Sequence, residues 1–227
     1  MLDLIILGVL LIFAFVGMHR GLIDEIVTLL GSLGALILSF IVYPLINIIL
    51  KLTPLYTYIN EWVREKVVTI QFGNGVQSQG QAIVRNFTWL PDFMSETLVK
   101  NNNPEVYKAL GANNIIDYVS ISITNIIMSM LALLITWLVL KVVLVGSVRI
   151  IGKFVAKLPV ISSLNKVGGF GIGIIKGLLT FWVITLVVPC IIAIPSYGGL
   201  ETLIEGSVLF KWLYENNLVL LVFQQVF

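Results

Sequence analysis

The residues of this chain that could do chemistry are few, and their spacing builds no catalytic or metal site. His19 is the single histidine, and Cys190, within an apolar run, is the single cysteine. These counts exclude a multi-cysteine metal site and an internal disulfide. The acidic residues are not clustered at the spacing of metal ligands or of an acid–base pair. We therefore expect no enzyme activity, no cofactor and no metal.

A glycine-rich segment over residues 165–177 is the next candidate for chemistry. It does not satisfy G-x-G-x-x-G, because Lys176 stands where the last glycine would follow Gly171 and Gly173, and it lacks the G-K-[ST] order of a phosphate loop. Glycines recur instead at every fourth position, on one helix face that another backbone can approach closely. These are Gly169, Gly173 and Gly177. The segment therefore predicts a helix-packing surface. We expect no nucleic acid among the partners of the protein.

Charged residues beside or within apolar runs are the third group of candidates, since a charge in a bilayer is costly and therefore usually functional. Lys176 is the strongest of them. Asp24 and Glu25 begin an apolar helix, where the helix dipole favours carboxylates. We predict an ion pair between Lys176 and Asp24 or Glu25, the alternative being that Lys176 extends to water. Arg20 and Lys141 complete this group of ionisable residues.

The elements that must position these groups are membrane-spanning helices. The chain of 227 residues is 58% hydrophobic and 11% charged, with a mean hydropathy of +1.02, far more apolar than a soluble domain. Four apolar segments stand between the charges, at 4–18, 26–50, 118–140 and 177–194, and each is read as one span of the bilayer. We predict an all-α polytopic membrane protein of four transmembrane helices with short flanking amphipathic helices.

Small and polar residues predict how these helices pack. The second span has a ladder of small residues at spacing four, which we expect to face the glycines of the fourth span. The ladder is Gly31, Ala35 and Ser39. The third span has one small and polar stripe that should face into the bundle, as a packing surface or, alternatively, as the lining of a polar pathway. The stripe is Ser122, Asn125, Ser129, Ala132 and Thr136.

Basic residues in the connection between the third and fourth spans predict the orientation of the protein. Arg149, Lys153 and Lys157 lie there, followed by Lys166, and no acidic residue accompanies them. Short basic loops stay in the cytoplasm, so both termini and the 51–117 region should lie outside. The spacing of four among the first three also predicts a basic membrane-surface helix. This helix would either bind anionic lipid head groups or merely enforce the topology.

The chain divides into four parts on this interpretation. Residues 1–50 form a helical hairpin of spans one and two, and residues 51–117 an extracytoplasmic insertion with short helices. Residues 118–200 hold spans three and four with the basic loop, and residues 201–227 form an amphipathic and hydrophobic tail. Within the insertion, an amphipathic pattern predicts a helix at Tyr58–Val68, and capping signals predict one at Asn103–Gly111. Glycine- and glutamine-rich sequence predicts a loop over 72–81.

Four short motifs follow one another along the chain. They are Asp3 in the first apolar span; Gly17-x-x-Arg20-Gly21 with Glu25; Leu164-Asn165-x-x-Gly168-Gly169 with Lys176-Gly177; and Glu205-Gly206-Ser207-x-Leu209-x-Lys211-Trp212-Leu213. Their order and spacing resemble the colicin V production protein family of bacterial inner-membrane proteins. The resemblance covers the chain apart from 51–117. The matching positions are Arg20, Gly21, Glu25, Asn165, Gly169, Lys176, Gly177 and Ser207.

This resemblance implies a multipass protein of the bacterial cytoplasmic membrane that is associated with toxin production and with upkeep of the envelope. It supplies no catalytic residue. One departure is the hydrophobic tail Leu218–Phe227, which leaves open whether the segment from Ser207 onward lies on the outer surface or re-enters the membrane.

Two functions remain as hypotheses. The first is a non-enzymatic accessory or scaffold protein of toxin (bacteriocin) production and export and of envelope maintenance. Its partners would be the lipid bilayer, including anionic lipids, and other membrane proteins or a second copy of the chain. The alternative is a small oligomeric channel or transporter with the stripe from Ser122 to Thr136 and Lys176 along its path.

Overall fold

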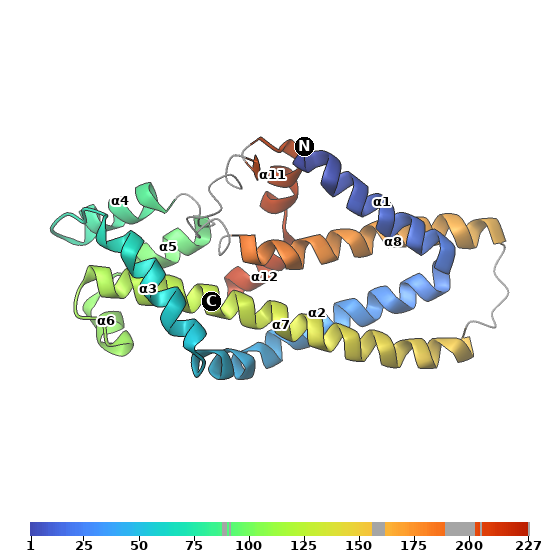
Figure 1. Ribbon diagram of the computed structural model, residues 1–227, viewed down its shortest axis with the longest axis horizontal. Coiled ribbons are helices and arrows are strands. Elements are labelled where there is room, and N and C mark those ends of the chain that lie inside the picture. Colours follow the sequence, from blue (N-terminus) through green and yellow to red (C-terminus); the bar gives the residue numbers. More distant parts are fainter. Residues whose placement is uncertain (88–89, 91, 156–161, 189–202, 205, 227) are drawn as a thin grey trace.

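The structure, a computed structural model, describes residues 1–87, 90, 92–155, 162–188, 203–204 and 206–226. All regular structure in these residues is helical, and they contain no strand. The elements are α1 (Leu2–Arg20), α2 (Leu22–Lys51), α3 (Pro54–Val68), α4 (Val76–Asn86), α5 (Asp92–Lys100), α6 (Pro104–Leu110), α7 (Ile115–Val155), α8 (Ser162–Ile184), the 3₁₀ turn η1 (Thr185–Val187), α11 (Val208–Glu215) and α12 (Leu218–Val226) (Figure 1).

Four of these helices are long and apolar enough to cross a membrane. Their candidate spans are Leu2–Arg20, Leu22–Lys51, Ile115–Ser147 and Ser163–Val187, in the described part of the chain. Each exceeds the roughly 17 residues that a bilayer requires. The prediction of an all-α polytopic membrane protein with four transmembrane helices is confirmed.

The helices that contain the third and fourth spans extend beyond the predicted bounds, which were set at lysines. The third candidate span continues through Lys141, and the fourth begins at Ser163, well before Gly177. Lys141 and Lys176 both have polar partners inside the bundle, so neither side chain needs to lie at the membrane–water interface. The predicted end of the fourth span, residues 189–194, lies outside the described residues.

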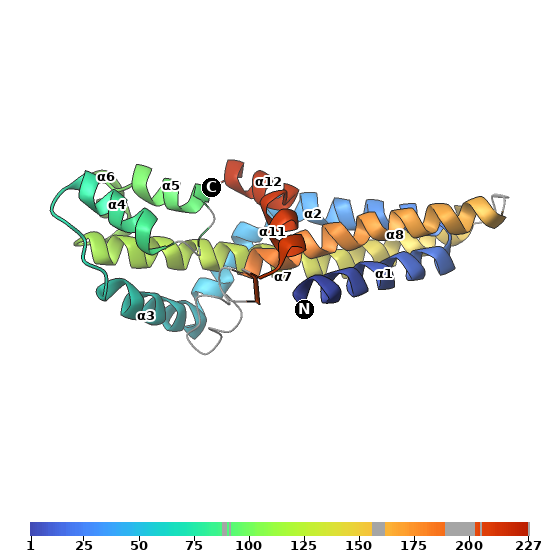
Figure 2. The ribbon, with the colours of Figure 1, turned by 90° about the horizontal axis from the view of Figure 1, so that it is seen from above.

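The long helices pack as two close pairs. Helix α1 lies along α8, and α2 lies along α7 (Figures 1 and 2). The turn between α1 and α2 stands at one end of the molecule. The short helices α3 to α6 gather at the opposite end, around the beginning of α7. The bundle therefore has two different ends, and the turn end contains the glycines and most of the predicted charged residues.

Helix α7 is the centre of the apolar core. Ile123, Leu133 and Trp137 on this helix are fully buried. They belong to a cluster that also takes in Ala35 of α2 and Val63 of α3. Because α7 is covered along much of its length by other helices of the same chain, it forms the axis of the bundle.

The short helices follow their local signals except in one place. Asn103 caps α6 by accepting from the Val106 amide, and Gly111 ends it in the left-handed region at φ 69°. The predicted loop over 72–81 is wrong from Val76 onward, where α4 begins. Gly80 and Ile83 are buried on this helix. Their packing against the rest of the region outweighs the low apolar content of the segment.

Candidate functional site

The turn between α1 and α2 is fixed by Gly21 and by a side chain from α8. Gly21 has φ 87°, a conformation that side-chain-bearing residues rarely adopt. The Asn165 side chain lies against it, and Asn165 Oδ1 accepts a hydrogen bond of 2.7 Å from the Leu22 amide. That amide is one of the free donors at the start of α2. Asn165 thus caps α2 from another helix.

Directly beside this turn, α1 and α8 touch through their backbones. A Cβ on Gly17 would overlap the Gly169 carbonyl oxygen and come within 3.0 Å of the Gly173 Cα, and a Cβ on Gly173 would overlap the Phe13 carbonyl. Gly177 lies one turn further along, where a Cβ would come within 3.0 Å of the Leu10 side chain. Only glycine permits so close a contact.

The predicted partner of this glycine face was wrong. It packs against α1, whereas the ladder on α2 packs against α7: a Cβ on Gly31 would lie 3.3 Å from Val145 Cγ2, and Ala35 and Ser39 are fully buried. Both pairings use small residues, but Gly17 gives α1 a flat surface that matches the α8 glycines. The signal in the sequence was the spacing of four between Gly17 and Gly21.

A buried charge cluster lies where α1, α2 and α8 meet. Lys176 Nζ forms a salt bridge with Glu25 Oε1, and Arg20 Nη1 lies 3.7 Å from Glu25 Oε2. The exposed fractions of the side chains are 0% for Glu25, 7% for Lys176 and 40% for Arg20. The Thr28 hydroxyl also donates to Glu25 Oε2, at 3.3 Å. Glu25 is thus the acidic centre between two cations, one deep and one open to the surroundings.

The pairing of Lys176 with Glu25 agrees with the predicted ion pair, and it excludes the alternative in which Lys176 extends to water. Asp24, the other predicted partner, is exposed. Side chains on a helix point toward its N-terminus, and Lys176 lies further along α8 than the Asn165–Leu22 contact. Lys176 therefore reaches back toward the turn to meet Glu25.

The polar stripe predicted on α7 lies only partly inside the bundle. Ser129 and Thr136 are buried, while Ser122 and Asn125 are partly exposed. Ser129 accepts a hydrogen bond of 3.1 Å from Asn47 on α2. The polar residues buried nearer the start of α7 are Asp117, Ser120 and Thr124, which the sequence prediction missed because it followed a single spacing along the whole helix.

The predicted basic surface helix coincides with the end of α7. Arg149 and Lys153 belong to this continuous helix, which runs to Val155, so they do not form a separate helix. Lys157 lies outside the described residues.

The sequence prediction also missed a contact between Asp3, at the start of α1, and Ser207, just before α11. Asp3 Oδ1 accepts a hydrogen bond from the Ser207 hydroxyl and one of 3.0 Å from the Leu209 amide. Ser207 in turn caps α11 by accepting from the Phe210 amide. A carboxylate at the start of a helix is favoured by the helix dipole. Asp3 therefore fastens α11 to the first turn of α1.

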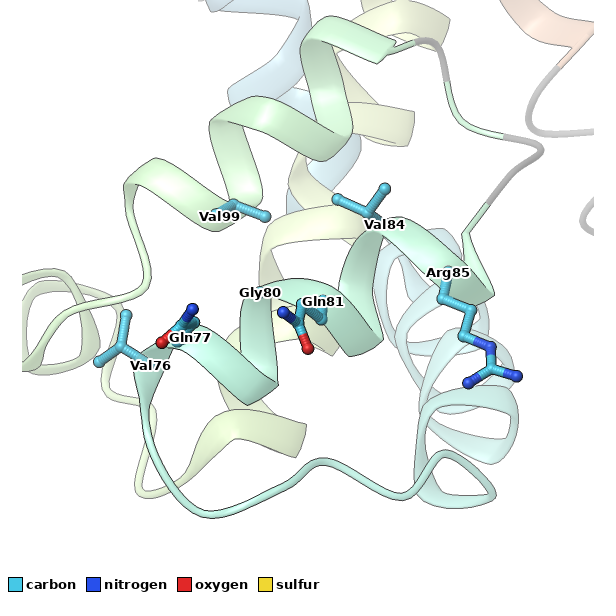
Figure 3. A pocket seen from close by; sticks show the side chains of 7 residues that line it. All are labelled: Val76, Gln77, Gly80, Gln81, Val84, Arg85 and Val99. Carbon is cyan, nitrogen blue, oxygen red and sulfur yellow. The ribbon is translucent and has the colours of Figure 1, made fainter.

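An open groove lies outside the bundle, between α4 and α5 (Figure 3). Its volume is about 680 Å³, and it is lined by Val76, Gln77, Gly80, Gln81, Val84, Arg85 and Val99. The lining has no combination of nucleophile, acid and base. Among the described residues, no three His, Cys, Asp or Glu side chains are placed to hold a metal ion. The charge cluster at the turn remains the candidate site.

The first third of the chain is similar to a known protein family. Residues 2–76 match the family model of the Colicin V production protein. This match supports the resemblance for α1 to α3, and it ends inside the region predicted to be an insertion. The motifs at 164–177 and 205–213 lie beyond it. No curated protein and no solved structure showed significant similarity to the chain.

Proposed function

We infer the function from the premise that residues 2–76 assign this chain to the colicin V production protein family. The chain is a multipass membrane protein with a non-enzymatic accessory or scaffold role in toxin (bacteriocin) production and export and in envelope maintenance. The observation that carries this proposal is the locked junction of α1, α2 and α8, in which backbones touch at Gly17 and a salt bridge is buried at Glu25. Such an arrangement suits a rigid support better than a moving gate.

The polar residues inside the bundle also favour a scaffold. Ser32 donates to the Thr28 carbonyl, Ser39 to the Leu36 carbonyl and Thr136 to the Ala132 carbonyl. Each hydroxyl is satisfied within its own helix and needs no water. These residues therefore support close packing, as small-residue interfaces in membranes do.

The outer faces of the bundle give such a scaffold its contact area. Ile12 on α1, Ile37 and Ile41 on α2 and Val142 on α7 are each more than half exposed, at 63%, 65%, 68% and 75%. In a bilayer these faces meet lipid or the helices of other membrane proteins. A second copy of the chain could use the same faces.

The second candidate, a small oligomeric channel or transporter, is favoured by one observation. Arg20, Glu25 and Lys176 form a row of charges that runs from a partly exposed position into the bundle, and intramembrane charges commonly mark ion pathways. Against it stand the internally bonded hydroxyls described above.

We propose that the protein lies in the bacterial cytoplasmic membrane. The end of α7 and the α1–α2 turn would face the cytoplasm, and both termini would lie outside. The reason is that basic residues such as Arg149, Lys153 and Lys166 lie at the turn end of the bundle. Anionic lipids at that surface would be the natural lipid partners. Labelling of single cysteines introduced at Leu2 or Lys166, in a chain in which Cys190 is replaced by serine, tests this orientation in intact cells.

Two measurements test the function together. In a bacteriocin-producing strain that lacks its own family member, expression of the chain should restore the secreted toxin titre. The purified protein in liposomes should give no ion leakage above that of empty vesicles. Leakage that disappears in the Asn125→Leu variant would favour the channel instead, and failure to restore toxin secretion would remove the scaffold role in this process.

A further inference from the structure

Lys141 is a second lysine inside the bundle, and its surroundings differ from those of Lys176. Its ammonium donates a hydrogen bond of 3.1 Å to the Thr180 hydroxyl on α8 and lies 4.1 Å from the centroid of the Trp137 ring on its own helix. No carboxylate of the described residues forms an ion pair with it. We propose that Lys141 is a docking point for an acidic side chain in the transmembrane helix of a partner membrane protein.

Lys141 lies level with the middle of the neighbouring helix α2, far from either end of that helix. Gly31 of α2 lies against Val145 of α7, and Asn47 of α2 bonds to Ser129 of α7, so the two helices run antiparallel. Counting one turn back from Val145 sets Lys141 level with Ala35, near the middle of α2. A lipid head group does not normally lie at that depth, so a protein helix is the natural source of an anion.

The chain itself shows what a lysine at this depth requires. Lys176 is buried beside Glu25, and the opposite charge offsets the cost of removing the ammonium from water. Lys141 has only a hydroxyl and a ring face, which are weaker partners than a carboxylate. Its ammonium has three donors, and one of them serves Thr180. A further acceptor with negative charge would complete the site.

The surface around Lys141 is open to such a helix. Lys141 is partly exposed, and its neighbours on the same side of α7, Leu138 and Val142, are 47% and 75% exposed. On α8, Ile184 is one turn beyond Thr180 and is 50% exposed. An apolar helix can lie against these side chains while its acidic residue meets the ammonium. Charge complementarity thus selects one class of helix from all those that could touch this face.

The inference rests on the proposed scaffold role, because it names the chemistry of one partner. Its test uses the full chain in liposomes with a synthetic transmembrane peptide of leucine and alanine that has one central aspartate. Energy transfer between dyes on the two molecules measures association. The aspartate peptide should bind about tenfold more tightly than the same peptide with leucine, as expected for one interhelical polar contact.

Variants of Lys141 decide the assignment. Lys141→Met should remove the preference for aspartate, Lys141→Arg should keep it, and Lys51→Met, at the exposed end of α2, should leave it unchanged. Equal binding of both peptides to the wild-type chain overturns the proposal. Lys141-dependent pairing of two copies of the chain without any peptide overturns it as well.

The two proposals fail separately. If toxin secretion requires the chain but the Lys141→Met variant supports it fully, the docking point is wrong and the scaffold role stands. If the wild-type chain does not support secretion, the scaffold role fails, whatever the peptide does in liposomes.

Discussion

Removing one partner of the Glu25–Lys176 pair should destabilise the protein more than removing both. A buried charge left without its partner costs about 3–5 kcal/mol, whereas replacing a whole buried pair by neutral side chains is often close to neutral. Lys176→Met leaves Glu25 with Arg20 at 3.7 Å and the Thr28 hydroxyl at 3.3 Å. Its cost should therefore lie near the lower value, about 3 kcal/mol.

Glu25→Gln should be the more damaging of the two single changes. It leaves two cations, Lys176 and Arg20, facing the same position with no acid between them. Its cost should approach about 5 kcal/mol, which is more than a thousandfold in the unfolding equilibrium. The double variant removes the anion and the deep cation together, and Arg20 is exposed enough to reach water. It should lie within about 1 kcal/mol of the wild type.

The measurement is reversible unfolding of the purified protein in mixed micelles, with increasing sodium dodecyl sulfate in dodecyl maltoside and helix content as the signal. Asp24→Asn is the matched control, since this neighbouring acid is exposed and its change should move stability by less than about 0.5 kcal/mol. A double variant whose cost equals the sum of the two single costs would refute the pairing. A larger loss in Lys176→Met than in Glu25→Gln would refute the role of Arg20.

Two further predictions concern the contacts of α1. Gly173→Ala should destabilise the protein by about 1–3 kcal/mol, because its Cβ would overlap the Phe13 carbonyl. Gly171→Ala is the control: its new Cβ would have no atom within 4 Å, so the change should be neutral or stabilising by up to about 1 kcal/mol. The same micelle titration compares the two variants, and equal effects would contradict the backbone contact. Asp3→Asn should speed proteolysis of the segment from residue 203 onward, because it weakens the cap on α11, whereas Glu215→Gln at the exposed end of that helix should not.

Composition and periodicity were sufficient to predict the class of fold, because a chain this apolar has few alternatives to spanning helices. The same sequence did not show that α7 and α8 continue through Lys141 and Lys176. A lysine is a boundary only when nothing inside the bundle pairs with it, and Glu25 and Thr180 are distant in sequence. The Lys176–Glu25 pair itself was predictable, since an acid at a helix start and an intramembrane lysine each need a partner.

Which helices pair was harder to predict than which residues form the contacts. Three helices have small residues at regular spacing, and spacing alone does not say which two will meet. The structure pairs Gly17 with the α8 glycines because all of these residues are glycine and the backbones can touch, whereas Gly31 meets the branched side chain of Val145. The Asp3–Ser207 contact had no local signal, since it joins positions at opposite ends of the chain.

The residues that match the family model depend on the rest of the chain for their structure. The two helices of the first hairpin diverge after their turn, and each packs on a helix from outside the match, α1 on α8 and α2 on α7. The polar contacts follow the same division, from Asp3 to Ser207, from Leu22 to Asn165 and from Glu25 to Lys176. Since a buried Glu25 without its lysine would be costly, the matched segment and the later helices must fold as one unit. Residues 165–177 of α8 are therefore the structural complement of the first two helices.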